Sequence, residues 1–434
     1  MTTTVAEAHH DFLAEFTAER AGTLIETFAS LTEPGDGPGV TRLGYSSLER
    51  QAHRVFTEHM RDLGLTVRTD AAGNTIAELT GSDPHLPALG TGSHLDSVPN
   101  GGAFDGIAGV VAAMEVARAL VTHRIQPRHT LRFVAFAAEE GARFGQACTG
   151  SRIIAGLTTA EDLPHLRDKD GISIAQAMTA LEIDPTRIEE AVWDPAEWAG
   201  FIELHIEQGS VLTDAGLPVG IVDLISGSTR IRMDLTGRAS HTGGTPMHLR
   251  ADALAAAAAI VLAAEELAND PRHRGTRITV GKLDVHPGSI TTIPGHCQLH
   301  IDVRDVDNDR QREATTELIS TAHGIAARRG VGFGVELLAD ASPVVLPVRV
   351  RNAIVGTAQR LGYRYRVMPS GASHDTQMIN HVTPSGMIFV PSLNHGVSHS
   401  PDEQTDYTDL AHGTGLLASS LLTLDASASV SHNV

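Results

Sequence analysis

Residues 93–109 read Ser-His-Leu-Asp-Ser-Val-Pro-Asn-Gly-Gly-Ala-Phe-Asp-Gly-Ile-Ala-Gly. An apolar run leads into His94, and Asp96 follows two positions later, so both side chains are expected on the same side of a strand end. A glycine-rich loop then places Asp105 just before a helical pattern over 107–120. Imidazole and carboxylate groups are the usual ligands of zinc-like divalent ions, and a second carboxylate can orient a ligand histidine. The stretch therefore predicts either a metal site or a polar loop whose aspartate caps the helix.

Size and composition exclude several classes of protein. With 434 residues the chain is too long for one ordinary hydrophobic core, so we expect two domains. Its apolar content is 41%, without a run of 18 or more apolar residues, which argues against a membrane as partner. The formal net charge of −19 argues against nucleic acid, because phosphates require basic surfaces. We expect a small-molecule partner.

Two features predict a cytoplasmic location. The first ten residues have neither a basic segment nor an apolar one, so no signal peptide is expected. The two cysteines, Cys148 and Cys297, do not make a disulfide framework, and they fit a reducing compartment.

Helical and strand patterns around the opening stretch predict a first α/β domain. Residues 11–30 place apolar side chains at helical spacing, and a second helix is expected over 47–63. Short strands are expected over 66–69 and 75–79, around a turn. An unbroken apolar strand over 130–137 follows the helix of the opening stretch. This strand–helix–strand order predicts an α/β sheet that is covered on both faces.

The apolar strand runs directly into two adjacent acidic residues, Glu139 and Glu140. Adjacent acids at the end of a buried strand are costly unless they bind a cation or share protons. Their side chains point in different directions, so one could bind a metal ion while the other faces a water molecule. The alternative interpretation is a solvated helix start. Nearby Cys148 is interpreted as a small buried packing residue rather than a nucleophile.

A later strand, over 200–209, also ends in polar groups. His205 within it is a third candidate metal ligand. A histidine at an alternating strand position is also typical of a core residue with satisfied hydrogen bonds, so both interpretations stay open.

From about residue 219 the order of elements changes to β-α-β-β-α-β, which is typical of a ferredoxin-like fold. We predict a separate α+β domain inserted into the first one. It carries two polar residues of interest, His241 in a glycine-rich loop and Arg304 in a strand. Arg304 either pairs with Asp302 or Asp305 or holds a substrate carboxylate. The predicted strands are 230–235, 277–283, 298–303 and 332–338, and the predicted helices are 251–268 and 310–329.

The α/β domain then resumes. Pro401 and Asp402 suit a helix start nearby, so Asp402 is interpreted as a helix cap. The tail from Asp425, rich in alanine and serine, is expected to be disordered. The expected elements of this part are helices over 348–361 and 408–424 and strands over 364–368 and 385–390.

Five motifs carry a resemblance to a known family. In order, they are 92–106 around the opening stretch, Glu-Glu-Gly-Ala-Arg-Phe-Gly from 139, His-Ile-Glu-Gln-Gly from 205, Gly-Arg-Ala-Ser-His-Thr-Gly-Gly-Thr-Pro-Met from 237 and Ser-His-Ser-Pro-Asp-Glu from 398. Over nearly its whole length the chain resembles the dinuclear metal amidohydrolases that include L-carbamoylases, allantoate amidohydrolases and β-ureidopropionases. These enzymes are a branch of the aminoacylase and zinc-exopeptidase group. The resemblance implies a metallopeptidase-like catalytic domain in 1–214 and 339–434, with a ferredoxin-like lid or dimerisation domain in 215–338.

The resemblance also implies two divalent metal ions per subunit. Asp105 would bridge the two ions. His94 and His205 would complete the shell of one ion, and Glu140 with His399 the shell of the other. Such mixed ligands accept Zn, Mn, Co or Ni.

Further roles follow from the same resemblance. Asp96 would orient the first histidine ligand, and Glu139 would be the general base. His241, from the inserted domain and reaching across a homodimer, would stabilise the oxyanion. Gln208 and Arg304 would hold the substrate's amide and carboxylate.

The first expectation for function is hydrolysis of an N-carbamoyl-L-amino acid to the amino acid, ammonia and carbon dioxide. Family members usually have an asparagine where this chain has Thr291, and that asparagine contacts the carboxylate side of the substrate. The shorter Thr291 leaves open an allantoate or ureidoglycine-type substrate, or an N-acyl amino acid or dipeptide. A catalytically silent metal-binding protein is the remote alternative, and the intact base and ligand set argue against it.

Overall fold

The computed structural model describes residues 11–35 and 37–427, and these divide into two compact units. The first ten residues, in which no signal peptide is expected, and most of the tail that is expected to be disordered lie outside the described residues. The first unit comprises the residues up to Asp223 together with 346–370 and the residues from His374 onward. The second unit comprises 224–345 and 371–373. Within the described part of the chain, no helix combines the length and the apolarity needed to cross a membrane.

The second unit begins later than the predicted residue 215, at Leu224. The reason is the strand β6, Val219–Ile225, which pairs antiparallel with β15, Ser385–Val390, and so extends the sheet of the first unit.

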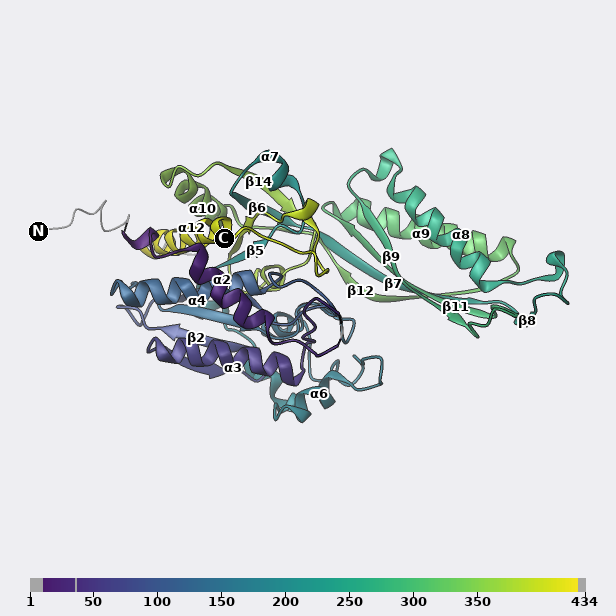
Figure 1. Cartoon of the computed structure of the whole chain (residues 1–434), viewed down its shortest axis with the longest axis horizontal. Helices are drawn as coiled ribbons and strands as arrows, with labels where there is room; N and C mark the ends of the chain where they lie inside the picture. The colour runs from purple at the N-terminus through teal and green to yellow at the C-terminus, as the bar shows by residue number, and fades with distance from the viewer. Residues whose placement is uncertain (1–10, 36, 428–434) are drawn as a thin grey trace, which may run out of the picture. The chain divides into compact units, whose positions relative to one another are not determined.

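A nine-stranded sheet forms the centre of the first unit, in the order β1-β2-β4-β3-β5-β15-β6-β13 with β14 beside β6 (Figure 1). Its middle strands β4, β3, β5 and β15 run parallel, so their carboxyl ends lie along one edge. In open α/β sheets that edge is where ligands bind. The other strands are β1 (Thr66–Thr69), β2 (Thr75–Leu79), β3 (Ala88–His94), β4 (Leu131–Phe136), β5 (Trp198–Ile206), β13 (Val344–Val345) and β14 (Tyr365–Ser370).

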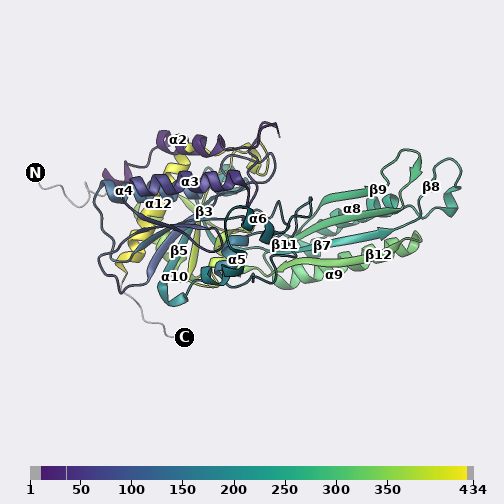
Figure 2. The ribbon, with the colours of Figure 1, turned by 90° about the horizontal axis from the view of Figure 1, so that it is seen from below.

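Both faces of this sheet are covered, as the unbroken apolar strands predicted (Figures 1 and 2). On β5, Ile202 and Leu204 pack into the core with the larger helices, whereas Phe201 packs with Trp198 on the opposite face. Because strand side chains alternate, His205 shares the face of Phe201. The larger helices are α2 (Ala18–Ala29), α3 (Ser47–Asp62), α4 (Ile107–Thr122), α10 (Val348–Arg360) and α12 (Tyr407–Ala426). Shorter ones are α5 (Thr149–Ile154), α6 (Ile174–Ala180), α7 (Val211–Ala215) and α11 (Asp375–Ile379).

One helix prediction and one cap prediction were wrong. The helix predicted over 11–30 is interrupted, because Thr17 has an extended backbone and its hydroxyl accepts the Arg20 N–H, so that α2 begins at Ala18. The last helix, α12, is capped by Asp406 rather than by Asp402, since Asp406 Oδ1 accepts the Thr408 N–H at 2.7 Å.

The second unit is a four-stranded antiparallel sheet with two helices. The sheet order β12-β7-β11-β9 and the β-α-β-β-α-β sequence of elements confirm the predicted ferredoxin-like fold. Alternate side chains of β7, among them Ile231, Met233 and Leu235, pack against the helices. The elements are β7 (Gly227–Thr236), α8 (Ala253–Ala268), β9 (Arg277–His286), β11 (His296–Asp305), α9 (Asn308–Arg328) and β12 (Gly332–Ala341), with a small two-stranded sheet of β8 (Ser240–His241) and β10 (Thr292–Ile293).

Candidate metal centre and active site

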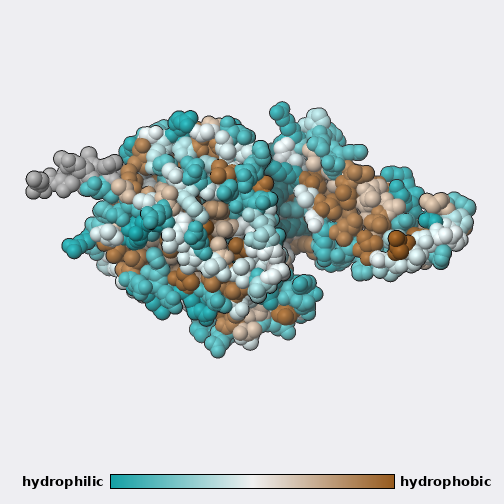
Figure 3. Space-filling model, in the orientation of Figure 1, coloured by the Kyte–Doolittle hydropathy of each residue, from teal (hydrophilic) through white to brown (hydrophobic). Residues whose placement is uncertain are grey.

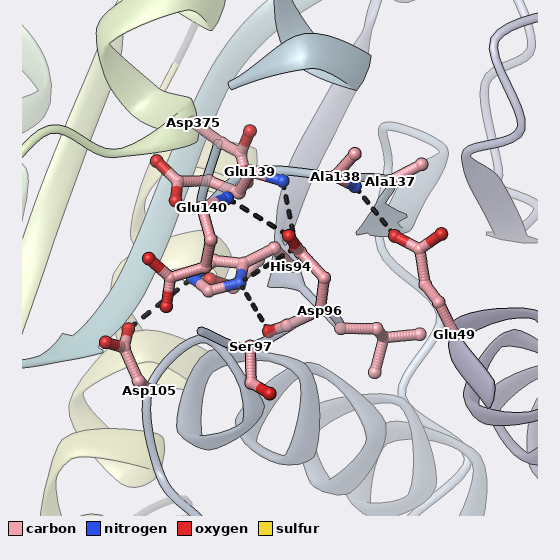
Figure 4. A network of polar contacts seen from close by, with 12 residues as sticks. Glu49, His94, Asp96, Ser97, Asp105, Ala137, Ala138, Glu139, Glu140 and Asp375 are labelled. Atoms are coloured by element: carbon pink, nitrogen blue, oxygen red, sulfur yellow. Dashed lines mark hydrogen bonds and ion pairs between the residues drawn. The ribbon is translucent and has the colours of Figure 1, made fainter. Parts of the chain in front are cut away.

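Six polar side chains of the first unit meet at the carboxyl ends of its parallel strands. Each comes from a strand end or from the loop that follows one, which is where buried strands release polar residues toward a ligand. They are His94 at the end of β3, Asp105 before α4, Glu139 and Glu140 after β4, His205 near the end of β5 and His399 after β15. Figure 4 shows His94, Asp105, Glu139 and Glu140 among them.

Asp105 lies between two groups of possible ligands. Its Oδ1 is 3.5 Å from His94 Nε2 and 3.2 Å from His205 Nε2. Its Oδ2 is 3.2 Å from His399 Nε2, which in turn is 3.3 Å from Glu140 Oε2. Each carboxylate oxygen thus completes a group of three ligand atoms that lie within 4.8 Å of one another. This is the arrangement required of a carboxylate that bridges two cations.

The histidines of the first group are oriented by their other ring nitrogens. His94 Nδ1 is 3.2 Å from the Asp96 backbone carbonyl and 3.4 Å from its carboxylate. His205 Nδ1 is 2.9 Å from the carbonyl oxygen of Ile206. When Nδ1 donates its hydrogen to these oxygens, Nε2 keeps its lone pair for a metal ion.

The carboxylates of the cluster stabilise positively charged groups beside them. Burial raises the pKa of Glu140 well above its usual value, and the nearby charge of Asp105 raises it further. Burial alone would also raise the pKa of Asp105, but hydrogen bonds from the histidines hold it well below its usual value. Burial lowers the pKa of His399, yet Asp105 and Glu140 together raise it to about 9.

The donor set fits two divalent cations. Oxygen Oε1 of Glu140 is buried and, among the described residues, has no hydrogen-bond partner. A buried acceptor of this kind is costly unless a cation faces it. The imidazole and carboxylate ligands are those that zinc-like ions prefer.

Glu139 lies beside these groups and is buried, with 5% of its surface exposed. Burial raises its pKa, and the Cys148 thiol donates to its Oε1 at 3.0 Å. Burial raises the pKa of that thiol well above its usual range, so Cys148 stays protonated. The contact between Cys148 and Glu139 was not foreseen from the sequence.

Asp96 binds the backbone of both acids. Its Oδ1 accepts the Glu139 N–H at 2.8 Å and its Oδ2 accepts the Glu140 N–H at 3.1 Å (Figure 4). Asp96 therefore fixes the acidic pair relative to His94, whose ring it also contacts.

Asp105 is held by a carboxylate from the far end of the chain. Glu403 Oε1 accepts the N–H groups of Phe104 at 2.9 Å and of Asp105 at 3.0 Å. Its Oε2 accepts the Ser398 hydroxyl at 2.6 Å. Gln208 Nε2 donates to Asp105 Oδ2 at 2.7 Å, on the side of His399. Glu403 and Ser398 belong to the 398–403 motif, but no pattern in the sequence assigned them these contacts.

In the second unit, His241 and Thr291 lie close together. Thr292 pairs with His241 across the β8–β10 sheet, and Thr291 precedes it. His241 Nδ1 accepts the N–H groups of Gly243 and Gly244, each at 3.0 Å, so its Nε2 carries the hydrogen.

Arg304 takes the ion-pair arrangement that the sequence left open. Its Nε donates to Asp302 Oδ2 at 2.8 Å. Asp305 pairs instead with Arg310. Its Nη1 also donates to the carbonyl oxygen of Gly371 at 3.4 Å.

Comparison with known proteins places the chain in a family. The model of Peptidase family M20/M25/M40 matches residues 90–423. The N-carbamoyl-L-amino-acid amidohydrolase of Paenarthrobacter aurescens is 40% identical over 390 residues, which cover 90% of this chain and 94% of the relative. The enzyme of the same name from Geobacillus stearothermophilus is 42% identical over 397 residues, covering 91% and 96%. The allantoate amidohydrolase of Escherichia coli (strain K12) is 35% identical over 398 residues, covering 91% and 95%.

A comparison with solved structures supports the same family assignment. An amidase of the hydantoinase/carbamoylase family from Burkholderia vietnamiensis superposes with a TM-score of 0.87 at 30% sequence identity, over 95% of this chain and 98% of the other. The chain therefore belongs to peptidase family M20/M25/M40 and, within it, to the hydantoinase/carbamoylase amidohydrolases that its five motifs resemble.

Proposed function

We propose that this protein hydrolyses N-carbamoyl-L-amino acids to the free amino acid, ammonia and carbon dioxide. The observation that carries the proposal is the placement of Asp105, whose two oxygens each face one group of ligands beside the buried carboxyl of Glu139. Two of the relatives that bear this activity in their names are 40% and 42% identical to the chain.

Two divalent ions, from among Zn, Mn, Co and Ni, would be held by the five ligands. His94, Asp105 and His205 would hold one ion, and Asp105, Glu140 and His399 the other. Ions bound there would polarise the scissile carbonyl and lower the pKa of a water molecule toward neutrality.

The chain's own residues would move the protons. Glu139 takes a proton from the attacking water at its carboxylate and returns it to the leaving nitrogen. Burial supports this role, because it raises the pKa of Glu139 and so lets the carboxyl hold the proton between the two steps. The Cys148 thiol, on Oε1, leaves Oε2 for the transferred proton. Asp96 keeps Glu139 in place through its backbone N–H.

Residues of the second unit and Gln208 are proposed to bind the substrate. His241 presents an Nε2 hydrogen, because its Nδ1 already accepts two N–H groups, and it would stabilise the oxyanion. Arg304 would hold the substrate carboxylate and Gln208 its amide. Thr291 would line the carboxylate side with a hydroxyl in place of the amide that family members have.

Allantoate is the second candidate substrate. The Escherichia coli relative named for that activity is 35% identical over almost the whole chain. Thr291 also favours a substrate whose carboxylate is held differently.

We further propose a homodimer in the cytoplasm. The helix α8 consists largely of alanine and lies beneath an apolar surface (Figure 3). It carries Leu262, whose surface is 59% exposed. Exposed apolar surface of this kind is typical of protein interfaces. Both cysteines are buried and unpaired, which fits a reducing compartment.

The test is ammonia release by protein reconstituted with Mn²⁺ or Zn²⁺. The panel holds N-carbamoyl-L-amino acids, allantoate, β-ureidopropionate and the matching N-acetyl and N-formyl compounds. We expect turnover of the carbamoyl compounds that is lost in Glu139→Gln and kept in Glu190→Gln, because the exposed carboxylate of Glu190 pairs with Arg187 on the surface. Turnover of allantoate alone would transfer the assignment to the second candidate, and no turnover of any compound would refute both.

A further inference from the structure

Residues 137–140 follow the end of β4, yet their backbone N–H groups are bound as completely as those of a strand inside a sheet. The acceptors are side chains from three other parts of the first unit (Figure 4). The Ala137 N–H donates to Asn74 Oδ1 at 2.9 Å, the Ala138 N–H to Glu49 Oε1 at 2.7 Å, and the N–H groups of Glu139 and Glu140 to the two oxygens of Asp96 at 2.8 and 3.1 Å.

The carbonyl groups of the same segment are bound from the other side. The carbonyl oxygens of residues 137, 138 and 139 accept the N–H groups of Gly150, Thr149 and Cys148 at 2.9, 2.9 and 2.6 Å. The position of the base Glu139 is therefore set by hydrogen bonds to its own main chain and to the residue before it.

Ala138 is the one strained residue of the segment. Its φ of 53° is in the left-handed region, which residues with a Cβ adopt only at a cost. Its Cβ fits closely against Gly44, since a Cβ built on that glycine would lie 2.5 Å from it. A left-handed residue immediately before Glu139 turns the chain away from the strand direction, so its conformation decides where the base points.

The side chain of Glu49 supplies the acceptor for the N–H of this strained residue. It lies in the first turn of α3, is fully buried, and its second oxygen accepts the Tyr45 N–H at 2.7 Å. Burial raises the pKa of Glu49 to about 7, and the Asp96 charge raises it too, while Arg50, 3.7 Å away, lowers it. A buried carboxyl is costly to keep, and the hydrogen bonds and ion pair of this one go to Tyr45, Ala138 and Arg50, none of which is a proposed metal ligand or substrate-binding residue.

We propose that Glu49 is a positioning residue for the general base: by accepting the Ala138 N–H, it holds the left-handed turn that aims the Glu139 carboxylate at the reacting water. The inference rests on the proposed function, because it takes Glu139 as the base. It assigns a part in the reaction to a helix that carries no ligand and no substrate contact.

The first variant is Glu49→Gln, which keeps the size of the side chain. An amide has one acceptor oxygen for the two N–H groups, so either Tyr45 or Ala138 must face an NH₂ group. We expect kcat to fall by about 10- to 100-fold, the range expected when a reacting group is misplaced by up to 1 Å. KM should change by less than about twofold, because ground-state binding is untouched.

The matched control is Asp425→Asn. Asp425 is also a buried carboxylate that accepts two backbone N–H groups, those of Arg128 at 3.0 Å and His129 at 2.7 Å, and it lies at the end of α12. The Asp425→Asn substitution weakens the same kind of interaction at a place away from the base. The kcat of this variant should therefore stay at the wild-type value, even if its melting temperature falls.

A double-mutant cycle separates positioning from general destabilisation. Glu139→Asp shortens the base but keeps a carboxylate. If Glu49 acts through the position of Glu139, the loss caused by Glu49→Gln should shrink to less than about threefold in the Glu139→Asp background. Independent, multiplying effects would overturn the proposal.

Hydrogen exchange gives a readout that needs neither activity nor metal. In the wild-type protein, the amide of Ala138 should be as protected as the amides of β4, and in Glu49→Gln the amides of 137–140 should exchange faster than in Asp425→Asn. Loop-like exchange of Ala138 in the wild-type protein would overturn the proposal even if no Glu49 variant folded. An inactive wild-type enzyme with a protected Ala138 would refute the proposed function instead, and a Glu49→Gln enzyme as fast as the wild type would refute the inference alone.

Discussion

Removing the Glu403 side chain should weaken both metal sites at once. Its two oxygens accept the N–H groups of Phe104 and Asp105 and the hydroxyl of Ser398. In Glu403→Ala the two buried N–H groups lose their acceptor, at about 1–3 kcal/mol each, or about 2–6 kcal/mol together. The loop that carries Phe104 and Asp105 would then move so that water binds these N–H groups. Because Asp105 faces both groups of ligands, its carboxylate would move away from both groups at once.

Glu403→Gln should be milder. One amide oxygen can still accept both N–H groups, and Ser398 can turn its hydroxyl around to accept from the new NH₂ group. The bonds lose only their ionic character, which we expect to cost about 1–2 kcal/mol in all.

The assay is competition between the protein and a chelator of known affinity, followed by the two metal-binding steps. Glu403→Ala should lower the affinity for both ions by at least about 30-fold, the equivalent of 2 kcal/mol. Glu403→Gln should lower it by about tenfold, and Asp425→Ala, which removes two comparable backbone contacts elsewhere, should leave it unchanged. Loss of one ion with wild-type affinity for the other would contradict the reasoning, because it would mean that Asp105 is not the common element.

Three further results are expected. Metal affinity should rise with pH up to about 9, because Asp105 and Glu140 outweigh burial and raise the pKa of His399 to about 9, so that a cation must displace the proton of this histidine. Calorimetric titrations with metal at pH 7 in two buffers should report the release of protons. Binding heats that do not depend on the buffer would contradict this. Glu49 should contribute a loss of about 3 kcal/mol to the free energy of unfolding of the metal-free protein as pH rises from 4.5 to about 7, because burial raises its pKa from 4.5 to about 7 and the unfolded carboxyl therefore ionises first. The pH dependence of unfolding should change by this amount in Glu49→Gln, and an unchanged dependence would refute that origin. Cys148→Ala should lower kcat by about two- to fivefold, as expected for one lost weak hydrogen bond to the base. The wild-type thiol should resist iodoacetamide in the folded protein, because burial raises its pKa. Rapid labelling of this thiol would contradict the environment assigned to it.

The sequence could predict those parts of the fold that follow from local periodicity. Apolar runs such as 131–136 and the β-α-β-β-α-β order gave the two folds, because strand alternation and helical spacing are visible over short windows. The boundary predicted at 215 differs from the division of the structure at Leu224, because β6 looks like any other strand in the sequence and only its pairing with β15 assigns it to the large sheet. The helix over 11–30 was placed by apolar spacing alone, which cannot show that Thr17 interrupts it.

The candidate site also has one part that the sequence could predict and one part that it could not. His94, Asp105 and Glu140 lie at strand ends, where a polar residue after an apolar run is conspicuous, and the geometry brings them together. The contacts that hold them are invisible to local patterns, since Glu49 reaches Ala138 across 89 positions and Glu403 reaches Asp105 across 298. Glu49 even has the spacing of a helix capping box after Ser46, which conceals its second contact.

The bond between Glu403 and the Asp105 loop also has a consequence for the order of events during synthesis. A ribosome delivers His94, Asp105, Glu140 and His205 in the first half of the chain, but His399 and Glu403 only near its end. Until then the Phe104 and Asp105 amides have no acceptor from Glu403, and one group of ligands lacks its histidine. A growing chain therefore lacks part of the proposed two-ion site until the 398–403 motif has been made, long after His205.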